Sequence, residues 1–248
     1  MIIETNDRLI RRNSAIAKYA SILGLIVLAA GFIITLRIPQ YASLSFVALI
    51  IGFLLSQVGI HYQNRWGRRP RPDELLNAAL KGMGGKYSLY HYTTPVSHLL
   101  VGPAGVWILF PHSQRGVITY EKGRWKQKGG GPLQVYLRLF AQEGLGRPDL
   151  EIGAEIANLR KYLATLLPEE GLPEIQAALI FTSADADIQI GEDVELPIPT
   201  ITLPKLKELI KKAAKGKPIS SDKMSEIQHL LTASEEPIEE EEEEESDE

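Results

Sequence analysis

The sequence predicts a mixed α/β domain preceded by a hairpin of two transmembrane helices. Three observations support this prediction. Apolar residues concentrate between positions 20 and 60. Short strand-like runs follow, separated by glycine-containing breaks, as in a meander of hairpins. Helical periodicity and one almost continuously apolar run come after them, which together indicate a mixed sheet flanked by helices.

Two apolar segments are each long enough to cross a bilayer. Residues 38–60 carry no charge, and residues 20–36 become long enough if the span is residues 15–36, with Lys18 reaching the interface. Arg37 and Pro39 separate the spans, because a charge at mid-membrane would cost several kcal/mol. The alternatives are a cleaved signal peptide and a buried soluble hairpin. The immediate second span and the all-round apolar character of both helices argue against them.

Basic residues indicate how the hairpin is oriented. Residues 1–14 and the basic linker, residues 61–72, flank it, whereas the turn carries only Arg37. We therefore expect a multi-pass protein of the cell membrane with both termini cytoplasmic. The linker bases serve as a topology signal and could also contact anionic lipid headgroups. The eight bases are Arg8, Arg11, Arg12, Lys18, Arg65, Arg68, Arg69 and Arg71.

Charge is distributed unevenly along the chain. The formal net charge is −4, yet residues 234–248 hold 11 of the 31 acids and no base. Without them, 20 acids face 27 bases, so the body of the chain is basic. We predict that residues 215–248 form a short helix and a disordered acidic tail. The chain has no cysteine, which excludes disulfides and thiolate chemistry.

The α/β domain is predicted to span residues 73–214. Its helices and strands are predicted from hydrophobic periodicity and from residues that cap helices or form turns. Helices are expected at 73–82, where Asp73 would be the cap, and at 133–143, 151–167 and 204–212, with a last one at 224–231. Strands are expected at 86–93, 98–101, 105–110, 116–126, 175–182 and 200–203.

This domain resembles the nuclease-related domain family, often written NERD. The resemblance is most specific in residues 96–109, Val-Ser-His-Leu-Leu-Val-Gly-Pro-Ala-Gly-Val-Trp-Ile-Leu, followed by Gly116 and Gly123-Arg124-Trp125. Looser support comes from Pro132-Leu133, Asn158-Leu159-Arg160 and residues 178–182, Ala-Leu-Ile-Phe-Thr. The resemblance implies a restriction-endonuclease-like fold, in which helices flank a mixed sheet.

The resemblance also implies a nuclease site, and here its motif is degenerate. Active members carry an acidic residue at the place of Ser97 and a Glu-x-Lys motif at the places of residues 110–112, which are Phe110, Pro111 and His112. Glu74 could match a helical glutamate. Phosphodiester cleavage of this type needs carboxylates for Mg²⁺ and a lysine for the attacking water. We therefore expect a catalytically inactive member without a cofactor.

Two other sites remain conceivable from the sequence. His91, His98 and His112 lie on three neighbouring strand-like segments, so a zinc site is possible, although independent histidines are the commoner case. A rearranged metal site for nuclease activity could draw on Glu74, Glu121 and His112, although no spacing brings them together.

A basic strand raises the possibility of nucleic-acid binding. Lys122, Arg124, Lys126 and Lys128 alternate, with Trp125 between them, and such a stripe can neutralise phosphates. A solvated face beside the membrane is the commoner explanation. The sequence thus favours a membrane-anchored binding or scaffolding module. The expected partners are the lipid bilayer and, as alternatives, nucleic acid or another protein.

Overall fold

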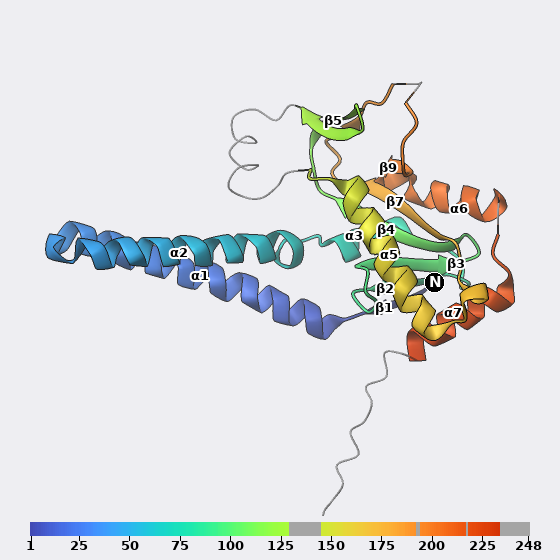
Figure 1. Ribbon diagram of the computed structural model, residues 1–248, viewed down its shortest axis with the longest axis horizontal. Coiled ribbons are helices and arrows are strands. Elements are labelled where there is room, and N and C mark those ends of the chain that lie inside the picture. Colours follow the sequence, from blue (N-terminus) through green and yellow to red (C-terminus); the bar gives the residue numbers. More distant parts are fainter. Residues whose placement is uncertain (129–144, 192–193, 217, 234–248) are drawn as a thin grey trace, which may run out of the picture.

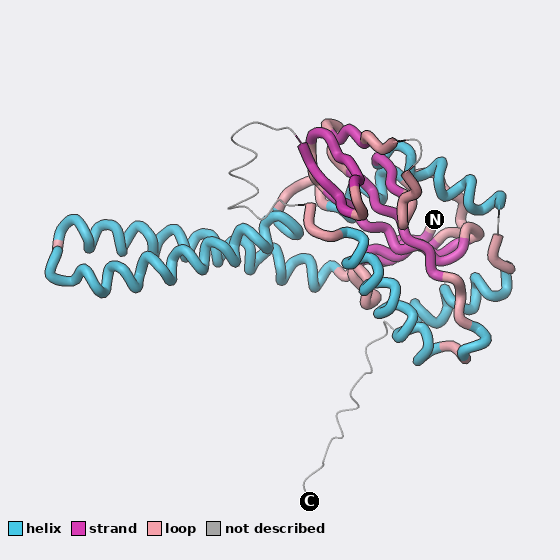
Figure 2. The backbone as a smooth tube through the Cα atoms, turned by 45° about the horizontal axis from the view of Figure 1, so that its top comes forward, coloured by secondary structure: helices cyan, strands magenta, loops and turns pink. Residues whose placement is uncertain are grey.

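The protein consists of a helical hairpin that projects from a mixed α/β domain (Figure 1). The computed structural model describes residues 1–128, 145–191, 194–216 and 218–233. The helix predicted at residues 133–143 and the acidic tail from residue 234 lie outside the described residues. The tube view in Figure 2 shows the two hairpin helices side by side and both of their outer ends at the domain.

The hairpin helices are α1 (Asp7–Arg37) and α2 (Ala42–Tyr62), joined by the 3-10 turn η1 (Pro39–Tyr41). Both are long and apolar enough to cross a membrane. Their large apolar side chains face outward: Leu25 is 67% and Phe46 is 65% exposed. Helix α1 starts before the predicted span because the Asn6 side chain accepts the Leu9 N–H at 2.9 Å and caps it.

Small residues hold the two helices together. The buried positions repeat every seventh residue, which keeps the contact on one face of each helix. A Cβ added to Gly24 would lie 2.8 Å from the Ser56 backbone nitrogen, and one added to Gly52 would lie 2.8 Å from that of Leu28. The backbones therefore touch where side chains would separate them. The stripe comprises Ala17, Gly24 and Gly31 on α1 and Ser45, Gly52 and Gly59 on α2.

A six-stranded sheet forms the centre of the domain, in the order β1-β2-β3-β4-β7-β9. The strands are β1 (Ile2–Thr5), β2 (Ser88–His91), β3 (His98–Gly102), β4 (Gly105–His112), β7 (Ile175–Phe181) and β9 (Thr200–Thr202). Strands β2, β3 and β4 form an antiparallel meander, whereas β1–β2, β4–β7 and β7–β9 are parallel. The parallel β4–β7 pair requires a crossover, and helix α5 (Pro148–Leu166) lies within it.

Helices cover both faces of this sheet (Figure 1). On one face, α5 and α7 (Ser221–Ala233) pack on alternate strand residues such as Leu99 and Ile108. On the other, α3 (Pro72–Ala79) and α6 (Leu206–Gly216) cover Leu100 and Trp107. This alternation follows from the period-two geometry of a strand, and it decides which candidate site residues can meet. The mixed sheet with flanking helices that the sequence predicted is therefore confirmed.

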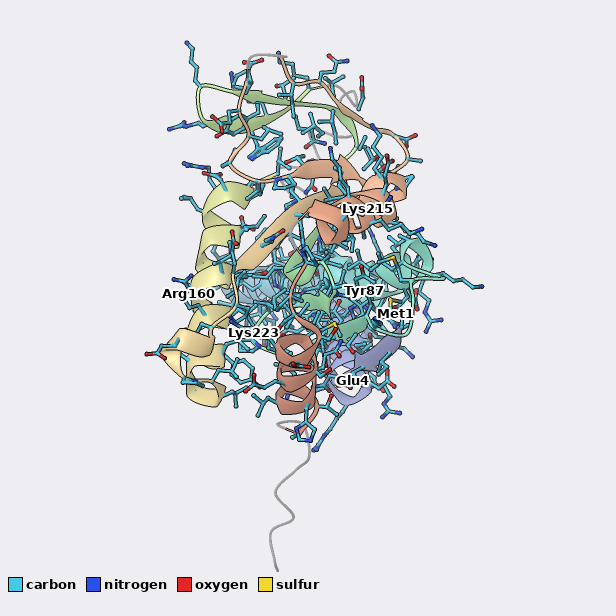
Figure 3. The ribbon with its side chains drawn as sticks, turned by 90° about the vertical axis from the view of Figure 1, so that its right-hand side faces the viewer. Met1, Glu4, Tyr87, Arg160, Lys215 and Lys223 are labelled. Atoms are coloured by element: carbon cyan, nitrogen blue, oxygen red, sulfur yellow. The ribbon has the colours of Figure 1, made fainter. Side chains whose placement is uncertain are left out.

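The α/β domain extends beyond its predicted boundaries at residues 73 and 214, because segments near both ends of the chain pack into it. Strand β1, from the N-terminal segment, pairs with β2 at the edge of the sheet. Helix α7 buries Met224, Ile227 and Leu231 in the core. Thr232 of α7 donates to Glu4 of β1 at 2.9 Å. Figure 3, viewed from the side away from the hairpin, labels Glu4 on β1 and Lys223 on α7 at this end of the domain.

Several predicted elements have different bounds in the structure. The run at 116–126 is two strands, β5 (Gly116–Glu121) and β6 (Arg124–Lys128), because Lys122 and Gly123 both adopt positive φ and form a two-residue turn. These strands form a second sheet with β8 (Ala186–Ile188). Helix α3 begins at Pro72 with Arg71 as its cap, not Asp73. The region at 204–212 is the 3-10 turn η4 (Leu203–Lys205) followed by α6.

We predict that Gly52→Leu destabilises the hairpin by about 1–3 kcal/mol, because the new side chain must push the α1 backbone away. Unfolding of the purified full chain in an SDS titration, followed by circular dichroism, measures this change. Ala30→Leu is the matched control, since Ala30 is exposed on α1. An equal loss of stability in both variants would contradict the close packing.

Candidate functional site

The structure gathers the three degenerate motif positions at one end of the sheet. In the β3–β4 ladder Leu99 pairs with Ile108, and the same register extended by one step places Ser97 across from Phe110. Both follow the strand alternation toward the α5 face, and so does His112 at the end of β4. The three positions at which the resemblance implies a nuclease motif therefore lie together on one face.

These three side chains have different surroundings. The Arg65 guanidinium donates to Ser97 Oγ at 2.6 Å. Phe110 packs against the core of the α5 face. The His112 ring lies between Phe110 and Phe181, with ring centroids 5.1 and 6.2 Å away, and its Nδ1 is 3.0 Å from Gln114 Oε1. Burial lowers the pKa of His112, against the opposing effects of Gln114 and Glu151, so the imidazole is held neutral.

Helix α5 brings two carboxylates toward this end of the sheet. Glu151 is exposed, whereas Glu155, one turn later, is partly buried and its Oε2 has no hydrogen-bond partner among the described residues. Burial raises the pKa of Glu155 to about 7; Arg65 opposes this shift and Glu151 adds to it. Glu155 therefore changes charge near neutral pH.

Arg65 links this end of the domain to the hairpin. It belongs to a π-helical turn, η2 (Gln63–Gly67), which directly continues α2. Its guanidinium carbon lies 5.3 Å from the centroid of the Trp66 ring, and Trp66 in turn packs at 4.5 Å against the ring of Tyr92. A cavity of about 340 Å³ opens beside Arg65, between α1, η2 and the loop before β3. Ser97 is part of its wall.

The other two histidines form a buried pair on the opposite face. His91 Nδ1 and His98 Nδ1 are 2.8 Å apart, and His91 Nε2 lies 3.1 Å from Asn77 Oδ1 on α3. With His91 donating to Asn77, the His98 Nδ1–H donates to His91. Burial lowers the pKa of His91 to about 4, against an opposing effect of Asp73. Burial also lowers the pKa of His98 well below its ordinary value.

The three-histidine zinc site is not present in the structure. His91 and His98 lie on the α3 face, whereas His112 lies on the α5 face, so the sheet itself separates them. In the described part of the chain, no group of three or more His, Asp or Glu side chains could hold a metal. Alternation along each strand, together with the register between the strands, places them on opposite faces.

Glu74 and Glu121, the two acids of the alternative nuclease site, form ion pairs in separate parts of the domain. Glu74 accepts the Arg71 N–H at 2.9 Å and pairs with the Arg71 side chain at 3.3 Å, so it caps α3. Glu121 lies on the second sheet, where Lys126 and Lys128 pair with it at 2.8 and 3.3 Å. The contacts of the described residues thus do not join Glu74, Glu121 and His112 into one site.

The basic strand keeps an exposed cationic face but has no exposed aromatic ring. Arg124, Lys126 and Lys128 project from one side of β6, with Lys122 in the preceding turn. Trp125 points the other way and is only 6% exposed, so it is not available to stack on a base. Because Glu121 also neutralises part of the charge, this face is weaker as a phosphate-binding surface than the sequence suggested.

Arg65 and Glu155 are the two site residues that the sequence reasoning missed. Arg65 was assigned only to membrane topology. Glu155 carried a usable signal, because it lies within the apolar stripe of α5 formed by Ile152 and Leu159. An acid on the buried face of a helix is uncommon and marks a special environment.

Comparison with known proteins adds no relative: no family model, curated protein or solved structure matches this chain.

We predict that Glu155→Gln stabilises the domain above pH 7, by on the order of 2 kcal/mol after allowance for solvent screening. The folded chain holds the Glu155 proton up to about pH 7, whereas an unfolded glutamate releases it near about 4.3. The contribution of Glu155 to the free energy of unfolding is therefore complete below about pH 4.3 and is lost as the pH rises through about 7. Thermal unfolding of the full chain across this range measures the effect.

Glu170→Gln is the matched control, since it removes the same charge from an exposed position that does not contribute to the pKa of Glu155. It should change stability by less than about 0.5 kcal/mol. The free energy of unfolding of the wild type is compared with that of E155Q at each pH. If this difference does not change between pH 5 and pH 8, Glu155 does not keep its proton up to about pH 7.

Proposed function

We propose that the protein is a membrane-anchored, catalytically inactive relative of the nuclease-related domain family, which acts as a binding or scaffolding module at the cytoplasmic membrane face. The observation that carries this proposal is the arrangement of Ser97, Phe110 and His112. They share one sheet end and one face, where the resemblance implies an acid, a glutamate and a lysine. None of them is a carboxylate, so these three side chains offer Mg²⁺ no oxygen ligand set of the kind that the resemblance implies.

The order of the elements supports the same proposal. Helix α3, the β2–β3–β4 meander, the crossover with α5 and the parallel strand β7 follow one another in the chain and make a mixed sheet with helices on both faces. The resemblance implies a sheet of this kind. In place of a metal site, the domain has a neutral imidazole, an aromatic ring, and a hydroxyl group bonded to Arg65.

The hairpin supports the membrane anchor. Two apolar helices whose large side chains are exposed would be unstable in water and are expected in lipid. Hydroxyl groups along them find acceptors within the hairpin: Ser21 donates to Ala17 O and Ser56 to Gly52 O, both at 2.8 Å. Both outer ends meet the α/β domain, so a spanning hairpin places the domain and β1 on one side of the membrane (Figure 2).

We expect the full chain to stay in the membrane pellet after alkaline carbonate washing. The chain has no cysteine, so single cysteines report topology directly. Gln40→Cys in the turn should react with an impermeant maleimide from outside intact cells, and Ser113→Cys in the domain only after permeabilisation. Release by carbonate, or the reverse labelling pattern, would contradict the anchor or its orientation.

We also expect no cleavage of DNA or RNA by the full chain with Mg²⁺ or Mn²⁺, because no carboxylate stands at the motif positions. A product assay on single- and double-stranded substrates checks this, with Glu74→Gln as the companion variant. Cleavage by the wild type that E74Q abolishes would overturn the inactive assignment. A weak cleavage that persists in E74Q would have to come from contamination or another site.

A further inference from the structure

A second cavity lies where the hairpin leaves its apolar zone. It measures about 530 Å³ and is formed by α1, the η2 turn and the linker that leads to α3. We call it the juxtamembrane cavity. The side chains that matter for the argument are Ser14, Lys18, Ile22, Trp66, Arg69 and Arg71.

The cavity has a polar end and an apolar end. Ile22 is 47% exposed and opens the belt of outward-facing apolar side chains that continues along α1 with Leu25 and Ile26. Lys18 lies one helical turn earlier, and the linker arginines Arg69 and Arg71 lie at the domain end. The lining therefore changes from aliphatic to cationic along the direction in which a lipid changes from acyl chain to headgroup.

Two of the cations, Lys18 and Arg69, are held less tightly than Arg71 and can turn toward a ligand. Among the described residues no ion pair is recorded for Lys18, whose ammonium lies 6.0 Å from the Tyr19 ring centroid. The Arg69 side chain is 78% exposed, and its ion pair with Glu74 is long, with 3.9 Å between Arg69 Nε and Glu74 Oε1. Arg71 is different, because it binds Asp73 through two hydrogen bonds of 3.0 and 2.9 Å and belongs to the cap of α3.

The wall of the cavity is held in place. The π-helical turn is closed by a hydrogen bond from Arg68 N to Gln63 O at 3.0 Å, and π-turns of this kind are common at functional sites. Ser14 on α1 donates to Trp66 O at 2.8 Å, which ties the two sides of the cavity together. Trp66 itself is anchored in a small core with Ile10 and Tyr92. The cavity therefore exists before a ligand arrives.

We propose that the juxtamembrane cavity binds the headgroup of an anionic phospholipid, with Lys18 and Arg69 contacting the phosphate and Ile22 contacting the start of an acyl chain. This inference rests on the membrane anchor proposed above. A lipid fits better than a free phosphate, since a small anion would leave the apolar end unfilled.

The test uses the purified full chain in a neutral detergent and measures binding of phosphatidylglycerol, phosphatidylcholine and inorganic phosphate by native mass spectrometry and thermal shift. The double variant K18Q/R69Q should bind phosphatidylglycerol at least about tenfold more weakly, since each base near an anionic surface contributes roughly a fivefold factor. The control R11Q/R12Q removes two exposed bases outside the cavity and should stay within about twofold.

Each outcome decides for or against the site. Selective loss in K18Q/R69Q, with its unfolding midpoint unchanged in lipid-free detergent, supports it. Equal loss in R11Q/R12Q, equal affinity for phosphatidylcholine, or full competition by inorganic phosphate would overturn it. Release of the protein by alkaline carbonate would remove the anchor and this site together, whereas membrane retention without a preference for phosphatidylglycerol would remove only this site.

Discussion

Trp66 packs between Ile10 and Tyr92, and this contact joins the two halves of the molecule. Ile10 lies in the first turns of α1, Trp66 in the turn that ends α2, and Tyr92 in the loop after β2. Helix α1 is also fixed at its start, because one residue separates it from β1, which is itself paired in the sheet. The hairpin is therefore attached to the α/β domain at the edge of the sheet where β1 and β2 lie.

Arg65 extends this junction into the region of the degenerate motif. Its guanidinium packs over Trp66 on one side and donates to Ser97 on the other. It also lies close enough to Glu155 to oppose the rise in the pKa of that carboxyl group. The Ser97 hydroxyl group therefore connects the α/β domain to the turn that ends the hairpin.

The two faces of the sheet divide the chemistry of the domain. The α3 face buries the His91–His98 pair with neutral imidazoles and Asp73 held by Arg71. The α5 face carries the degenerate motif and the buried acid of α5. A single layer of β-sheet separates them. Proximity along the sequence, as between Ser97 and His98, is therefore a poor guide to shared function in a strand.

The sequence alone determined the two apolar helices, the meander of strands, the buried strand β7 and most helix positions, because these depend on local periodicity and on runs of apolar residues. It could not determine that the strand predicted at 116–126 folds back at Lys122, since a lysine with positive φ has no local signature. Only the tertiary structure decided that Trp125 is buried, that His112 is separated from His91 and His98, and that Arg65 meets Ser97. Those facts depend on which face each strand presents and on contacts between residues far apart in the chain, and a local pattern contains neither.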